Sequence, residues 1–243
     1  MHKVCALIPV FNHELALPAV VAQLRAAGLS CLLVDDGSSP ACAAVMDALA
    51  AQPECYLLRL SSNQGKGGAV MAGLREAVRL GFSHALQVDA DGQHDLQSLA
   101  GFLAAAAASP QTLICGYPQY DASVPKGRLY ARYLTHVWVW VNSLSLRIPD
   151  SMCGFRVYPL AVTLALIDSV AIGRRMDFDT EVLVRLSWLN QPMHWLPIRV
   201  RYPADGLSHF RLLHDNALIS KMHAKLFFGM LLRAPLILWR RWR

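Results

Sequence analysis

The stretch VDADGQHD, residues 88–95, places three carboxylates directly after an apolar run. In a turn, Asp89 and Asp91 can converge on one cation, because a single residue separates them. Carboxylate oxygens, and the amide oxygen of Gln93, are hard ligands that suit Mg²⁺ or Mn²⁺. An acidic turn without a ligand is the alternative, and Asp95 is expected to cap the helix that follows. The pattern predicts a metal site at Asp89, Asp91 and Gln93, with Asp91 and Asp89 as the pair on which function is expected to depend most.

A second acidic pair, Asp35 and Asp36, ends the run LLVDDGSS and precedes another predicted helix. Asp, Gly and Ser all favour turns and helix N-termini, which is one interpretation of this segment. In the other, one carboxylate accepts hydrogen bonds from a nucleobase or a ribose. Two acidic strand ends in one sheet favour the second interpretation.

The stretch SSNQGKGGAV, residues 61–70, has the glycine content of a phosphate-binding loop, but two such patterns do not match. A Walker A motif requires glycine where the chain has Leu60, and the dinucleotide fingerprint requires glycine where it has Val70. What remains is a glycine-rich helix start with Lys66, which either binds an anion or serves only as a turn.

These polar clusters follow apolar segments that alternate with amphipathic ones. The alternation predicts strands at about 4–10, 31–34, 56–60, 85–88 and 112–115, and helices at about 17–27, 40–51, 67–80 and 95–108. Such an order with short loops predicts an α/β fold built on a Rossmann-like, mostly parallel, doubly wound sheet. Ligands of these sheets bind beyond the carboxyl ends of the strands, where the polar clusters lie.

The second half of the chain has longer segments. Its pattern predicts an amphipathic segment at 124–146, a loop or short strand at 150–159, a helix at 177–190 and a strand at 193–202. In the apolar tail KLFFGMLLRAPLILWRRWR, Pro235 is expected to separate halves too short to span a bilayer, which needs about 20 residues. We expect a C-terminal amphipathic helical tail in the membrane interface, with a helix packed on the domain as the alternative.

The composition is that of a globular protein, with 54% hydrophobic and 16% charged residues. The net charge is +6, and the last eleven residues hold four arginines and no acid. This end indicates an anionic partner, and its Leu, Ile and Trp content favours a lipid surface over nucleic acid. Six cysteines without a CxxC pair argue against zinc or a disulfide framework and favour reduced thiols in the cytosol. The N-terminal apolar run is too short for a signal peptide.

Six motifs carry a resemblance to a known family. In order, they are LIPVFNHE, LLVDDGSS, NQGKGGAVMAGL, VDADGQHD, SMCGFRVY and DFDTEVLVRL. In this order and spacing the chain resembles the family two glycosyltransferases over about residues 4–202, in particular the branch of dolichyl- and polyprenyl-phosphate mannose or glucose synthases. The resemblance implies a GT-A fold, a nucleotide diphosphate sugar donor, Mg²⁺ or Mn²⁺, and inversion at the anomeric carbon.

When the functional residues of the family's motifs are matched one by one to this sequence, the resemblance implies a donor site. The residues assigned to the donor are Pro9, Asn12, Glu14, Asp35, Asp36, Gly65, Lys66 and Asp89. Asp89, Asp91 and Gln93 would hold the metal on the diphosphate. The chain departs from the family pattern in two places, with FNHE where Tyr-Asn-Glu is usual and His209 where lysine is common.

The acceptor decides which further residues take part. A lipid phosphate is already ionised at neutral pH and needs positioning by arginine rather than a base. The residues assigned to the acceptor are Arg128 and Arg132, one helical turn apart, with Arg156 and His209. A hydroxyl acceptor, on a glycolipid or a lipid-linked pigment, would instead need a carboxylate base, for which Asp179 and Glu181 are the candidates.

We therefore predict an inverting glycosyltransferase that moves a hexose to a lipid-linked acceptor, in the first place a polyprenyl phosphate. Residues 1–210 would form the GT-A domain, with a donor half at 1–118 and an acceptor half at 119–210, and residues 211–243 the tail. The protein would be cytoplasmic and peripheral on the inner face of the cytoplasmic membrane, without a nucleic-acid partner. The sequence does not disclose an oligomeric state. A non-catalytic membrane-binding protein is the alternative of another class, but it would not need the acidic strand ends.

Overall fold

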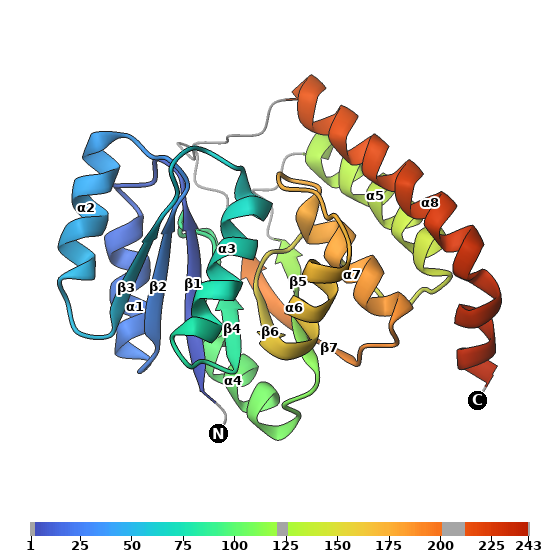
Figure 1. The fold of residues 1–243 in the computed structure, drawn as a ribbon, viewed down its shortest axis with the longest axis horizontal. Helices are drawn as coiled ribbons and strands as arrows, with labels where there is room; N and C mark the ends of the chain where they lie inside the picture. The colour runs from blue at the N-terminus through green and yellow to red at the C-terminus, as the bar shows by residue number, and fades with distance from the viewer. Residues whose placement is uncertain (1–2, 121–125, 201–211, 243) are drawn as a thin grey trace.

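The computed structural model describes residues 3–120, 126–200 and 212–242 of the chain. At its centre is a seven-stranded sheet in the order β3-β2-β1-β4-β6-β5-β7 (Figure 1). The strands are β1 Val4–Val10, β2 Ser30–Asp35, β3 Cys55–Arg59, β4 His84–Gln87, β5 Leu113–Tyr120, β6 Arg156–Pro159 and β7 Met193–Val200. All neighbouring strands pair in parallel except β6, which is antiparallel to both β4 and β5. The predicted mostly parallel sheet is confirmed.

Helices cover both faces of the sheet, so the doubly wound arrangement is also confirmed. They are α1 Leu17–Ala26, α2 Pro40–Ala50, α3 Lys66–Arg79, the 3-10 turn η1 Leu96–Ser98, α4 Leu99–Ala108, α5 Lys126–Ser143, α6 Leu160–Ser169, α7 Phe178–Trp188 and α8 Leu212–Trp242. One core cluster lies under α1, α2 and α4, and a second lies under α3, α6 and α7. Helices α5 and α8 lie side by side beyond α7 (Figure 1).

The central strands are buried because helices cover them on both sides. Every residue of β2 is buried, which is typical of a parallel strand between two helical layers. Helix α3 comes especially close to the sheet at Gly73, where an added Cβ would lie 2.2 Å from Leu7 Cδ1 and 2.8 Å from Val34 Cγ2. This close approach holds the start of α3 beside the carboxyl ends of β1 and β4.

The tail forms one helix, and the prediction that Pro235 divides it is wrong. Helix α8 continues through Pro235 from Leu212 to Trp242. Contacts with α7 support it on both sides of the proline: the Arg233 guanidinium lies 5.1 Å from the Trp188 ring, and Arg240 donates to the Trp188 carbonyl at 3.1 Å. Such contacts offset the cost of an internal proline, about 3 kcal/mol.

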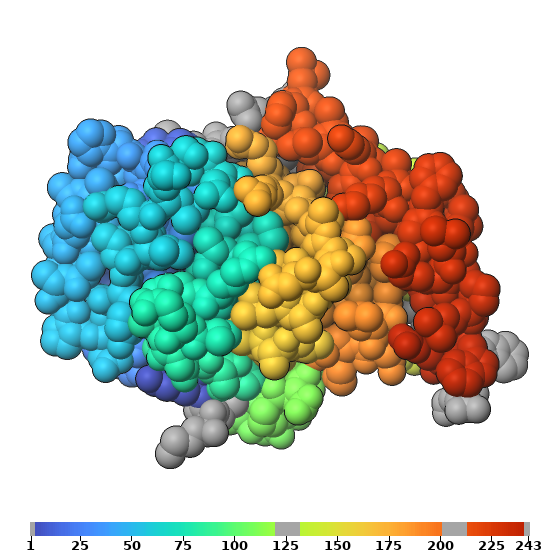
Figure 2. Space-filling view, in the orientation of Figure 1, coloured from blue at the N-terminus to red at the C-terminus, as the bar shows by residue number. Residues whose placement is uncertain are grey.

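The continuous helix also corrects the expectation that no segment is long enough to span a bilayer. Within the described residues, Leu213–Arg240 is long and apolar enough to cross a membrane by length and composition. One side of α8 buries Met222, Leu226, Met230 and Ile237 against the domain. Figure 2 shows α8, in red, along one edge of the molecule.

We expect Gly73→Ala to lower the free energy of unfolding by about 1–3 kcal/mol, because the new methyl group overlaps Leu7 and Val34. Gly101→Ala is the matched control: Gly101 is exposed in α4, with nothing within 4 Å of an added Cβ. That variant should gain up to about 1 kcal/mol from helix propensity. Urea unfolding of both variants measures the difference, and shifts of the same sign would contradict this packing.

Candidate functional site

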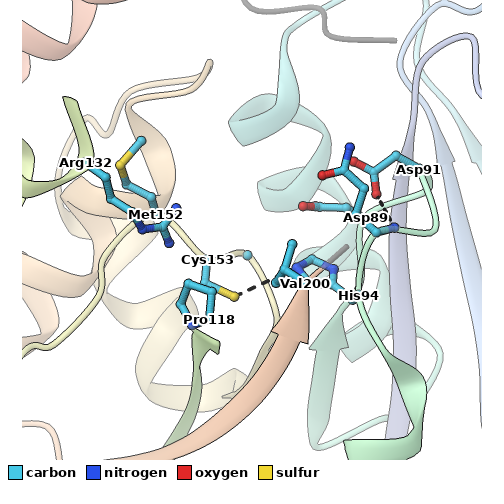
Figure 3. A pocket seen from close by; sticks show the side chains of 10 residues that line it. Asp89, Asp91, His94, Pro118, Arg132, Met152, Cys153 and Val200 are labelled. Atoms are coloured by element: carbon cyan, nitrogen blue, oxygen red, sulfur yellow. Dashed lines mark hydrogen bonds between the residues drawn. The ribbon is translucent and has the colours of Figure 1, made fainter. Parts of the chain in front are cut away.

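A cavity of about 100 Å³ opens beyond the carboxyl end of β4, at the edge that the sequence pattern indicates. One wall carries Asp89, Asp91, Gln93 and His94, and the opposite wall carries Arg132 and Met152 (Figure 3). Acidic groups and an arginine therefore face each other across one small space. Pro118, Cys153 and Val200 lie between the two walls (Figure 3).

Lys66 connects three segments at this cavity. Its Nζ lies 2.8 Å from Asp89 Oδ1 and 3.2 Å from Asp179 Oδ2, so the start of α3, the loop after β4 and the start of α7 meet at one ammonium group. Gln87, at the end of β4, also contacts Asp179: its Nε2 donates to Asp179 Oδ1 at 3.2 Å. Burial opposes the charge of Lys66, but Asp179 and Asp89 outweigh it and raise the pKa of the lysine. Burial would raise the pKa of Asp89, but Lys66 and His94 lower it, so the pair stays ionised.

The turn after Asp89 is tight and fixed. Asp91 Oδ1 accepts from the Gln93 amide at 3.0 Å, and Gly92 has a φ of 71°, which favours glycine. The Asp95 carboxylate accepts from the Gln97 amide at 3.0 Å, so its predicted capping role is confirmed for η1. The Asp95 amide donates to the Arg199 carbonyl at 3.0 Å, which attaches the turn to β7.

His94 is a cavity residue that sequence reasoning missed. Its ring lies 5.3 Å from the Phe155 ring, its Nε2 is 3.8 Å from Cys153 Sγ, and its buried Nδ1 has no hydrogen-bond partner among the described residues. Burial lowers the pKa of His94, and the neighbouring carboxylates of Asp89 and Asp91 oppose that shift. Gln87 was missed as well, although a glutamine inside an otherwise apolar strand is a signal that could have found it.

The chemistry of the donor set suits a hard divalent cation. Asp89, Asp91 and Gln93 line the same cavity, and among described residues the Asp91 carboxylate accepts only from the Gln93 amide. The described part of the chain nevertheless contains no group of three His, Cys, Asp or Glu side chains already arranged as metal ligands. The Lys66 ammonium supplies positive charge beside Asp89.

The acidic residues at the end of β2 hold neighbouring loops. Asp36 accepts from the amides of Gln64 at 2.6 Å and Gly65 at 2.9 Å; burial raises its pKa, and these two hydrogen bonds oppose that shift. Asp35 accepts from the Ser38 amide at 2.8 Å and from Arg59 Nε at 2.9 Å. Both carboxylates therefore shape the loops around the predicted nucleoside site.

The residues predicted for the donor at the end of β1 and in the loop after it lie beside these loops. Pro9 pairs with Val34 of β2, and Asn12 Oδ1 accepts from the Ser39 amide at 2.8 Å. Glu14 differs from them, because its buried Oε2 has no hydrogen-bond partner among the described residues. Most buried polar atoms have such a partner, so this oxygen has an unused capacity to accept a hydrogen bond.

The glycine-rich stretch, predicted as an anion site or a turn, also packs closely against another segment of the chain. The Gly68 amide at the start of α3 donates to the Arg174 carbonyl at 2.8 Å. A Cβ on Gly67 would lie 2.4 Å from Phe178 Cβ, and one on Gly65 would lie 2.7 Å from the Arg174 carbonyl oxygen. The glycines therefore allow the segment 173–178 to pack on the start of α3, and a protein carbonyl takes an amide that the prediction left for an anion.

Two of the predicted site residues are buried away from the cavity, which corrects their expected roles. Arg156 has no exposed surface and donates to the carbonyls of Asp179 at 2.7 Å and Ser151 at 2.8 Å, so it supports Asp179 and does not reach an acceptor. Glu181 is 1% exposed and its Oε1 is paired with Arg185, so it is not available as a base. Burial removes both side chains from contact with a substrate.

Of the four predicted acceptor residues, only Arg132 lies at the cavity within the described side chains. Its Nε donates to Asp150 Oδ2 at 2.6 Å, and His136 Nε2 lies 3.2 Å from the same oxygen. Burial would raise the pKa of Asp150, but His136 and Arg132 lower it. His209 and the side chain of Arg128 lie outside the residues that the structure describes.

The family assignment follows from comparison with known proteins. The model of "Glycosyl transferase family 2" matches residues 5–164. The chain belongs to glycosyl transferase family 2. It is 29% identical to an undecaprenyl-phosphate mannosyltransferase of Micrococcus luteus over 81% of this chain and 82% of that protein. It is also 29% identical to a polyprenol monophosphomannose synthase of Mycolicibacterium smegmatis, over 71% of this chain and 67% of that protein.

Solved structures support the fold. Glucosyl-3-phosphoglycerate synthase from Mycobacterium tuberculosis superposes with a TM-score of 0.68 at 13% identity, over 94% of this chain and 80% of that one. TarS 1-349 of S. aureus, solved in complex with UDP-GlcNAc, superposes with a TM-score of 0.60 at 14% identity, over 92% of this chain and 66% of that one. The GT-A fold and the family implied by the sequence motifs are thus confirmed, and the chain is a glycosyltransferase.

We expect Arg156→Met to lower the free energy of unfolding by about 3–5 kcal/mol, because it leaves the buried carbonyls of Asp179 and Ser151 without their donor and removes the guanidinium that lies 3.7 Å from the Asp179 carboxylate. Arg147→Met, at an exposed position, is the control and should change stability by less than about 0.5 kcal/mol. Denaturant unfolding compares them. A stable Arg156→Met variant with a raised KM for the acceptor would restore the acceptor-binding role.

Proposed function

We propose that this glycosyltransferase moves a hexose from a nucleotide diphosphate sugar to a polyprenyl phosphate, with inversion at the anomeric carbon. The observation that carries the proposal is the cavity whose one wall presents Asp89, Asp91 and Gln93 and whose other wall presents Arg132. The first wall suits a cation and a diphosphate, and the second suits an anionic acceptor. Relatives named for transfer to undecaprenyl phosphate and polyprenol support the same pairing.

The state of the carboxylates favours a phosphate acceptor over a hydroxyl acceptor. A hydroxyl needs a base to take its proton, but Glu181 is buried and paired with Arg185, and Asp179 is paired with Lys66. A phosphate monoester is itself the nucleophile, and an arginine on the cavity wall can orient it. Glycosylation of a glycolipid or lipid-linked pigment remains the second candidate, and it would require Asp179 to leave Lys66.

A divalent cation, Mg²⁺ or Mn²⁺, completes the proposed donor site. Asp89, Asp91 and Gln93 would hold it, and when bound it would offset the charge that builds on the leaving nucleoside diphosphate. The chain's own groups assist by position: Lys66 supplies a fixed positive charge at the cavity wall, and Asp36 holds the loop that carries it. The buried Oε2 of Glu14 is a candidate acceptor for a donor hydrogen bond from the nucleoside.

We place the protein on the cytoplasmic face of the membrane through α5 and α8. These neighbouring helices expose apolar side chains over much of their length. They are Tyr133, Leu134, Val137, Trp138 and Val141 on α5, and Phe228, Leu231, Leu232, Leu236, Leu238 and Trp239 on α8. A bilayer surface would cover them and release water from apolar area. Arg132 lies on α5 itself, so an acceptor phosphate at the membrane surface would approach the cavity from this helix.

A non-catalytic membrane-binding protein would account for α5 and α8 but not for the cavity. The acidic turn is held from three directions, by Lys66, by the Gly92 turn and by the backbone bond to Arg199. This arrangement keeps carboxylates together at one wall despite their mutual repulsion. A catalytic role explains why the protein bears the repulsion between these carboxylates, and membrane attachment alone does not.

We expect Asp91→Asn to lower the rate of hexose transfer at least about a hundredfold, because the variant removes a charged metal ligand and leaves the turn intact. Asp95→Asn is the matched control, since asparagine caps as well as aspartate and Asp95 lies outside the proposed ligands. The assay is transfer of labelled hexose to polyprenyl phosphate with Mn²⁺. Equal activity of the two variants would contradict the proposed metal site.

We also expect the double variant Phe228→Glu/Leu232→Glu to bind anionic vesicles of phosphatidylglycerol and phosphatidylcholine at least about tenfold more weakly, because both side chains are exposed on α8. Val78→Glu changes an exposed apolar residue on α3 and should bind like the wild type. Co-sedimentation with vesicles measures the difference. Undiminished binding of the double variant would place the membrane surface elsewhere.

A further inference from the structure

Lys225 links the tail helix to the body of the domain at a buried carboxylate. Its Nζ lies 2.9 Å from Glu181 Oε1 and donates to the Ala171 carbonyl at 2.6 Å. Glu181 is 1% exposed, and its second oxygen accepts from the Gly173 amide at 2.9 Å. One lysine of α8 and one glutamate of α7 therefore hold both ends of the segment 171–173.

The segment that continues from Gly173 packs directly on the start of α3. The Arg174 carbonyl accepts from the Gly68 amide at 2.8 Å, and the Arg174 guanidinium donates to Gln64 Oε1 at 3.3 Å. At Gly67 an added Cβ would lie 2.9 Å from the Gly173 carbonyl oxygen, so the two backbones touch with no room for a side chain. A shift of this segment must therefore move the glycine-rich stretch or break its hydrogen bonds.

The glycine-rich stretch in turn forms part of the proposed donor site. The Gln64 and Gly65 amides donate to Asp36, and Lys66 pairs with Asp89 at the cavity wall. Figure 1 shows the same order of elements, with α7 between α8 and α3. Hydrogen bonds and ion pairs, joined by short stretches of backbone, thus connect Lys225 on the tail helix to Asp89.

We propose that Lys225 is a positioning residue for the donor site, which acts through Glu181 and the segment 171–175 on the start of α3. The inference rests on the proposed function for the identity of the ligand, a nucleoside diphosphate. Removal of the Lys225 amine leaves Glu181 paired with Arg185, so the buried carboxylate keeps a cation. The segment 171–175 then loses its hydrogen bond to α8 at the Ala171 carbonyl, and the site that it supports becomes less well ordered.

The variant Lys225→Met tests the inference, with Lys221→Met, at an equally exposed position one turn earlier on α8, as a control and Lys225→Arg as a rescue. Hydrogen exchange at residues 64–69 should be roughly three- to tenfold faster in Lys225→Met, and unchanged in Lys221→Met. The dissociation constants of UDP and GDP with Mn²⁺, from calorimetry, should rise by the same factor for whichever nucleotide binds. Lys225→Arg should restore both values.

The two readouts separate this inference from the proposed function. If the wild type binds no nucleoside diphosphate but exchange at residues 64–69 still depends on Lys225, the proposed function fails and the positioning role stands. If the wild type binds nucleotide and Lys225→Met matches it in both exchange and affinity, the positioning role is overturned. The positioning role is also overturned if Lys221→Met accelerates exchange as much as Lys225→Met does. Any loss of a lysine from α8 would then have the same effect.

Discussion

The ammonium group of Lys66 between the carboxylates of Asp89 and Asp179 is the interaction on which the rest of the site depends. The loop with Asp89 and the helix with Asp179 meet there, and without the ammonium group their two carboxylates would repel each other in a largely buried space. The ion pairs also set the relative positions of α3, α7 and the loop after β4. Each neighbouring contact then serves to hold one of these three segments in place: Asp36 holds the loop before α3, and Arg156 and Gln87 hold Asp179.

The place of the proposed donor residues in the fold could be predicted from sequence because the signals are local. The acidic turn after β4 and the acidic end of β2 follow apolar strands, and parallel strands bring their carboxyl ends to one edge. The role of Asp95 as a cap was also readable from residue types alone. The glycines of the stretch 61–70 could not be interpreted in this way, since the segment that requires their small size, 173–178, lies more than 100 residues away.

The acceptor side was harder to predict, because burial decides the role of its charged residues and burial is a tertiary property. Arg156 and Glu181 have the residue types expected of a site, yet both are buried, Arg156 against the Asp179 carbonyl and Glu181 between Arg185 and Lys225. The helix through Pro235 has the same explanation: contacts with Trp188 from α7 maintain a helix that local propensity alone would end. Arg132, by contrast, lies at the cavity, with its side chain held by Asp150, which His136 also contacts.

The most direct test of this mechanism is a product assay with matched acceptors. The purified protein would be incubated with Mn²⁺ and a panel of nucleotide diphosphate hexoses, together with either a polyprenyl phosphate or the corresponding polyprenol, and the lipid products identified by mass spectrometry. The predicted result is a hexosyl polyprenyl phosphate from at least one donor, and no product from the polyprenol. Transfer to the polyprenol, or none to the phosphate with any donor, would contradict a cavity built to join a metal-bound diphosphate to a lipid phosphate.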